Sequence, residues 1–184
     1  MSYCIDYCGE DDVTTHLVDN CPRTRQGGAS SGVLLSCDAV LTDPTDGTEI
    51  LALIAAGNAW KFTFTNISYG KPTAKEQPSN VPCQPAEIIN YAFAGVIKDD
   101  NVNATNIAFW NAKNGRKFGG MLIAECGNET NMLKYINQPF TLSGGDMLPD
   151  NADSNQMIEM DFKGEKVPKN SIIWSVYDMP VGVF

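Results

Sequence analysis

The chain reads DPTDGTEILALIAAG from Asp43 to Gly57, and this stretch predicts a capped helix between two strands. Asp46 and Glu49 have the spacing of an N-terminal capping box, although that box normally begins with Ser or Thr. Gly57 predicts the end of the helix, because glycine readily adopts the left-handed conformation that follows many helices. Apolar residues recur at helical spacing on one predicted face, at Ile50, Leu53 and Ile54.

Alternating apolar residues on both sides of this helix predict strands. Residues 33–41 carry an apolar side chain at every odd position, which predicts a strand with one buried face. Trp60, Phe62 and Phe64 alternate with polar residues, and the alternation then shifts by one residue. The shift predicts a bulge or bend near Asn66. Further strands are expected at 89–97, 118–126, 132–143, 156–163 and 171–177.

A second short helix is expected around Phe109 and Trp110, and Asn114-Gly115 would end it. Trp110 is interpreted as an anchor in the core rather than a platform for a ligand. With about seven strands and two helices, the chain is expected to be mainly β (α+β). The predicted architecture is an antiparallel β-sandwich or small barrel with one or two flanking short helices.

The chain divides into an arm and one domain. Residues 1–32 are polar and irregular and end in a glycine-rich hinge, so they predict an extended N-terminal arm. Residues 33–184 predict a single β-sandwich domain. Four prolines fall within residues 70–86, which predicts a long loop there, either solvated or in contact with a neighbouring subunit.

The charge of the chain argues against nucleic-acid binding as a main role. The net charge is −9 at pH 7, and only 19% of the residues are charged. Binding to phosphates requires clustered cations, which an acidic chain of this kind lacks. Acidic residues suit either ordinary solubility or a wall that DNA passes without adhering. Neither an apolar run of membrane-spanning length nor a secretory signal is present, so no membrane partner is expected.

Cysteines near the N-terminus raise the question of a metal site. Cys4, Cys8 and Cys21 could bind zinc with His16 as the fourth ligand, but only one pair resembles a zinc knuckle. The favoured interpretation is reduced thiols on an extended arm, with Cys37 and Cys126 as small core residues on strands. No metal or other cofactor is therefore expected. The weak candidates for metal ligands are Cys4, Cys8, Cys21 and His16.

No catalytic constellation is evident in the sequence. His16 is the only histidine, and no nucleophile motif accompanies it. Asp146 and Asp150 lie in an acidic loop that suggests weak calcium binding, but the pattern lacks the features of an EF-hand. A calcium-dependent hydrolase using either aspartate is the least favoured hypothesis, and the chain is expected not to be an enzyme.

Several motifs resemble those of virion structural proteins from crAss-like tailed bacteriophages and their relatives. The resemblance covers about residues 21–126. The motifs that carry it are the lead-in from Cys21 to Gly28, the strand around Cys37, the stretch Asp43 to Gly57, Cys83-Gln84-Pro85-Ala86-Glu87, Asp99-Asp100-Asn101 and Phe109-Trp110-Asn111. The resemblance implies a tail-tube-like β-sandwich that assembles into rings, and it implies no catalytic residues.

The leading functional hypothesis is therefore a subunit of a tail tube or head-to-tail connector ring. Its expected partners are copies of itself and neighbouring virion proteins, with DNA only passing through the lumen. Its expected location is the virion, assembled in the cytoplasm of the host bacterium. The alternative is a capsid-decorating or fibre-related binding module with a β-sandwich fold.

Overall fold

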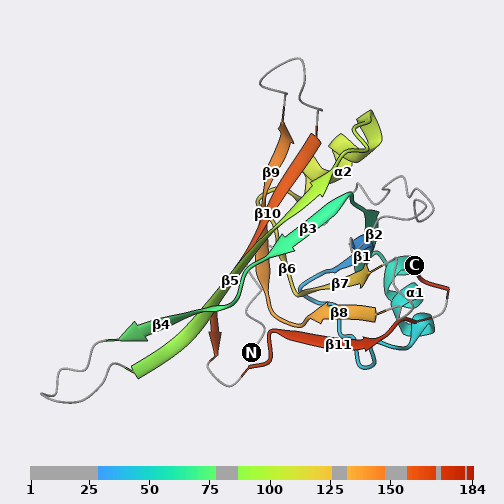
Figure 1. Cartoon of the computed structure of the whole chain (residues 1–184). Coiled ribbons are helices and arrows are strands. Elements are labelled where there is room, and N and C mark those ends of the chain that lie inside the picture. The colour runs from blue at the N-terminus through green and yellow to red at the C-terminus, as the bar shows by residue number, and fades with distance from the viewer. Residues whose placement is uncertain (1–28, 78–86, 126–131, 148–156, 169–170, 181) are drawn as a thin grey trace, which may run out of the picture.

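The computed structural model describes residues 29–77, 87–125, 132–147, 157–168, 171–180 and 182–184. These residues form two antiparallel sheets and two helices, and neither sheet closes into a barrel (Figure 1). The predicted fold class, mainly β with a two-sheet architecture and short flanking helices, is thus confirmed.

Sheet A has the strand order β11-β8-β7-β1-β2. Its strands are β1 (Ala29–Leu35), β2 (Ala59–Thr63), β7 (Gly120–Glu125), β8 (Met132–Ile136) and β11 (Trp174–Asp178). Sheet B has the order β3-β5-β10-β9-β6, and β4 also pairs with β5. Its strands are β3 (Asn66–Tyr69), β4 (Thr73–Gln77), β5 (Glu87–Asp99), β6 (Lys117–Phe118), β9 (Phe140–Met147) and β10 (Met157–Pro168).

The main core lies between the two sheets. Leu34, Phe62 and Ile123 from sheet A and Ile97 and Phe162 from sheet B belong to one buried cluster. A second cluster covers the opposite face of sheet A, where α1 (Gly47–Ala55) packs on the strands. Sheet A is therefore apolar on both faces, whereas the outer face of sheet B is left to solvent among the described residues.

Helix α1 confirms the prediction made from the opening stretch. The Asp46 side chain caps the helix by accepting a hydrogen bond from the Thr48 amide at 2.8 Å. Glu49 reaches past the cap and accepts from the amides of Thr42 and Asp43 at 2.8 and 2.9 Å. Gly57 has the expected left-handed backbone, with φ of 74°.

Helix α2 (Ala104–Lys113) also lies where the sequence predicted a helix. Asn103 caps it, because its side chain accepts from the Asn106 amide at 2.9 Å. Trp110 is 1% exposed, which confirms its interpretation as a core anchor. The helix sits at the end of sheet B beside β9 and β10 (Figure 1).

Two predicted strand boundaries are wrong because the chain changes sheets there. Near Asn66, where a bulge or bend within one strand was predicted, the chain crosses between sheets: Thr63 pairs with Ser31 in sheet A, and Asn66 pairs with Lys98 in sheet B. The predicted strand at 132–143 is likewise two strands, β8 in sheet A and β9 in sheet B. The apolar positions shift by one residue at the first crossing and keep the same parity from Ile136 to Phe140 at the second, and both sheets face the same core at these positions.

Other boundaries also differ from the predictions. Strand β1 begins at Ala29, inside the predicted arm, and ends at Leu35 rather than at residue 41. Residues 73–77 of the predicted loop form β4 instead. The rest of that loop, residues 78–86, and residues 1–28 of the arm lie outside the described residues.

Three glycines face phenylalanines across neighbouring strands. The pairs are Gly32 with Phe62, Gly95 with Phe162, and Gly164 with Phe93. A methyl group on Gly95 would lie 2.2 Å from Cζ of Phe162 and 2.4 Å from the Ser68 carbonyl oxygen. Each ring therefore occupies the space that a side chain would need, and the glycines allow the strands to carry large aromatic rings.

Candidate functional site

One edge of sheet B is formed by β3 and β4 in succession, and β6 lies at the other edge. β10 pairs with β5 from Asn90 to Asp99, so β3 and β4 must both lie on the other side of β5. No described strand pairs with the outer side of β3 or β4. Four of the five β4 residues are exposed. This edge offers unpaired backbone groups to another chain.

The β4–β5 ribbon, defined as residues 73–77 and 87–92, projects away from the body of the molecule (Figure 1). Toward the start of β5, the pairing with β10 stops at Asn90, which lies opposite Pro168. Beyond that point the ribbon has only two described strands, with Glu76 opposite Ile88 and Gln77 opposite Glu87. A two-stranded ribbon is only marginally stable in water unless something packs against it.

Sheet A has its own edges at β2 and β11. The β11 edge is partly apolar: Val176 is 51% exposed, and Ile172, just before the strand, is 71% exposed. Trp174 at the start of β11 is held by aromatic contacts with Tyr69 and Phe93 of sheet B, at centroid distances of 5.0 and 5.7 Å. This edge is therefore anchored to the core while presenting apolar side chains outside.

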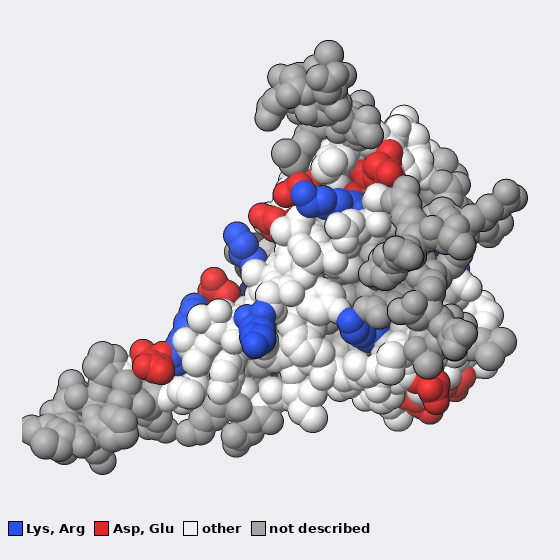
Figure 2. Space-filling view, in the orientation of Figure 1, with Lys and Arg blue, Asp and Glu red and all other residues white. Residues whose placement is uncertain are grey.

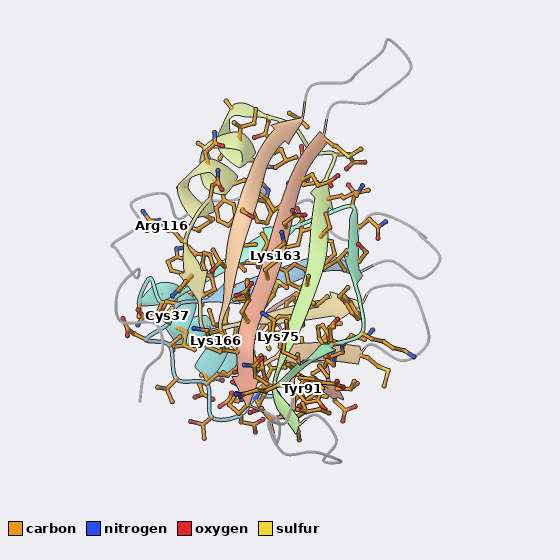
Figure 3. All side chains as sticks on the ribbon, turned by 90° about the vertical axis from the view of Figure 1, so that its left-hand side faces the viewer. Cys37, Lys75, Tyr91, Arg116, Lys163 and Lys166 are labelled. Atoms are coloured by element: carbon orange, nitrogen blue, oxygen red, sulfur yellow. The ribbon has the colours of Figure 1, made fainter. Side chains whose placement is uncertain are left out.

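The outer face of sheet B carries a shallow depression of about 460 Å³. Strands β3, β5 and β10 line it with Ser68, Tyr69, Gly70, Ala94, Gly95, Val96, Asp161 and Lys163. Figure 3 looks onto this face, with β10 between β9 and β5 and Lys163 near the middle of the strand. Charged side chains of both signs alternate along the margin formed by β4, β5 and β10 (Figure 2).

An acidic corner surrounds the start of α1. Hydrogen bonds from the Asp43 and Thr42 amides hold the pKa of Glu49 below its ordinary value. The Thr45 hydroxyl and amide likewise lower the pKa of Asp43. These carboxylates already accept hydrogen bonds from their own loop, so their arrangement is explained by helix capping.

Charged and polar groups in the core serve α2 rather than a reactive site. The Lys113 side chain is fully buried, with Nζ 4.4 Å from the Trp60 ring centroid and 4.7 Å from that of Phe109. Both contacts are cation–π interactions, which gain strength when they are desolvated. The contact with Trp60 joins the last turn of α2 to β2 of sheet A, whereas Phe109 lies within α2 itself.

The candidate metal ligands are not placed. Cys4, Cys8, His16 and Cys21 lie outside the described residues, as does Asp150. Asp146 belongs to β9, but its side chain is not described. Within the described ranges, no three His, Cys, Asp or Glu side chains form a group that could hold a metal ion.

Cys37 differs from its predicted role. It was expected on a strand in the core, but it lies half-buried in a turn after β1. Its thiol donates to the Lys117 carbonyl oxygen at 3.4 Å. Cys126, expected to play a similar role, falls outside the described residues.

Sequence reasoning missed the depression on sheet B, because its lining comes from three strands far apart in the chain. Only the alternation of Asp161 and Lys163 with buried residues could have placed both on the solvent face. Neither described helix has the length and apolarity needed to cross a membrane. No known family model and no curated protein matches the chain.

Proposed function

We propose that this chain is a non-enzymatic structural subunit of a tailed-phage virion. Copies would assemble into a tail tube or a head-to-tail connector ring through which DNA passes. The observation that carries this proposal is the projecting β4–β5 ribbon, together with the free edge that β3 and β4 form beside it.

The free edge supports assembly because its backbone groups can complete a sheet with a neighbour. β3 contributes four residues and β4 five, so nine residues form this edge (4 + 5). A long free edge is normally protected in a monomeric protein, because it promotes association. An edge on one copy that meets a different surface on the next copy produces a ring when the rotation closes.

The ribbon supports the same proposal. Its outer part has no third described strand, so it gains stability if it packs on an adjacent subunit. Its projection beyond the body places it where an adjacent copy would lie (Figure 1). Passage of DNA, and location in a virion, rest on the resemblance and on the net charge of −9.

Shortening the ribbon tests this role. Glu76 and Ile88 face each other, so residues 77–87 can be replaced by Asn-Gly, which favours a two-residue hairpin turn. We expect this variant to keep its circular dichroism spectrum and melting temperature but to lose higher-order assembly in sedimentation velocity.

A matched control shortens a different hairpin. Met147 and Met157 also face each other, so Asn-Gly can replace residues 148–156 between β9 and β10. This control should assemble like the wild type. Normal assembly of the ribbon variant would contradict the proposed contact, and a monomer that binds head shells would instead favour a capsid-decorating module.

A further inference from the structure

The middle strand of sheet B, β10, carries a charged side chain at successive outward positions. In β10, Ile158, Met160 and Phe162 point into the core, so Glu159, Asp161 and Lys163 point outward. Beside Asp161 and Lys163 the register places small or uncharged residues, Val96 and Ala94 on β5 and Ser143 and Thr141 on β9. Asp161 and Lys163 therefore have no charged residue directly beside them on β5 or β9.

Asp161 and Lys163 themselves have no ion pair or side-chain hydrogen bond within the described part of the chain. Their neighbour Glu159 differs, because it forms a salt bridge with Lys98 at 3.0 Å. Asp161 is half-buried, and Lys163 is exposed. The two unpaired charges of opposite sign thus line the same depression on the middle strand of the sheet.

We propose that this face binds the same face of a second copy of the chain. A two-fold axis between the faces would cross β10 at right angles, level with Phe162. The axis would place Asp161 of each copy opposite Lys163 of the other, and Val96 opposite Ala94. The contact uses a face rather than the edges of the proposed ring, so it goes beyond the proposed function.

The charge pattern selects a second copy over other occupants. A ligand or partner of one sign would satisfy only one of the two side chains and would be repelled by the other. The order Asp161 then Lys163 is complementary to itself when one copy is reversed. The same axis sets Glu159 opposite Glu165, two carboxylates, and the twist of both sheets separates the faces at that distance from Phe162.

Reversal of the charges tests the pairing. Asp161→Lys and Lys163→Asp should each weaken self-association about tenfold or more, because a reversed residue would face a like charge. The double variant Asp161→Lys/Lys163→Asp exchanges the two signs and should restore the wild-type affinity. Association is measured by sedimentation equilibrium, and thermal unfolding checks that each variant folds.

Asp38→Lys supplies the matched control, because Asp38 is an exposed aspartate in the turn after β1. It changes the net charge as Asp161→Lys does and should leave the affinity unchanged. Single reversals that associate like the wild type, or a double variant no better than the singles, would overturn the pairing. So would a wild-type chain that stays at 20.0 kDa at every concentration.

The two proposals fail in distinguishable ways. If the outer faces of sheet B pair but no ring forms, the mass of the wild-type particle should reach about 40 kDa, twice the chain mass of 20.0 kDa, and no more. If rings form without face pairing, large particles should persist unchanged in all three charge variants.

Discussion

Trp110 donates its indole N–H to Oδ2 of Asp99 across 3.0 Å in the interior of the protein. Asp99 is the last residue of β5 and is 2% exposed, and its Oδ1 accepts from the Asn101 amide at 3.0 Å. One buried carboxylate therefore joins the end of sheet B to α2 and shapes the turn between them. The sequence predicted Trp110 as a core anchor, but it predicted a strand that ends at residue 97 and did not reveal the buried position of Asp99 or this contact.

Loss of the indole donor should destabilise the fold. Trp110→Phe keeps an aromatic ring but leaves one oxygen of a buried carboxylate without that partner, which should cost about 2–3 kcal/mol. The free energy of unfolding from urea titration measures the loss. Asp99→Asn retains an acceptor oxygen and should cost less, and a Trp110→Phe protein as stable as the wild type would contradict this account.

Close packing at Gly95 predicts a second effect. A methyl group there meets the buried Phe162 ring and a backbone oxygen, so Gly95→Ala should lose about 1–3 kcal/mol through overpacking. Gly145 has no atom within 4 Å of the added methyl group and serves as the control. Chemical denaturation of both variants compares them, and equal stability would show that the Gly95–Phe162 pair can relax.

Tyr135 should make stability fall at alkaline pH. Burial, with smaller contributions from Tyr177 and Glu49, raises the pKa of Tyr135 from 10.0 to about 12. Between these two pH values the unfolded chain loses the phenolic proton while the folded chain keeps it. The contribution of Tyr135 to the free energy of unfolding is therefore complete below pH 10 and is lost toward pH 12. Tyr135→Phe should flatten this part of the unfolding profile, and an unchanged slope would disprove the assignment.

Glu49 should act at the acidic end of the profile. The pKa of Glu49 lies below its ordinary value of 4.5 in the folded protein. Glu49 therefore contributes to the free energy of unfolding above pH 4.5, and this contribution is lost as the pH falls through the lowered pKa. Glu49→Gln should therefore lower stability at neutral pH and reduce the acid sensitivity of unfolding. Thermal melts across the acid range measure both effects, and Asp38→Asn, at an exposed aspartate in the turn after β1, provides the comparison.

Local signals predicted the helices well, because caps and glycine stops act within a few residues. Asp46 and Gly57 delimit α1, and Asn114-Gly115 follows α2. The sheet crossings after Thr63 and between Ile136 and Phe140 were missed, because alternation reports which face is buried and not which sheet a strand joins. The Gly–Phe pairs and the Asp161–Lys163 depression depend on register between distant strands, which local pattern does not determine.

Electron microscopy of the purified chain, alone and with virion extract, tests the central claim most directly. If copies associate through the β3–β4 edge and the projecting ribbon, class averages should show closed rings or tubes with an axial opening. A particle that remains a single chain at every concentration and never joins virions would contradict the account.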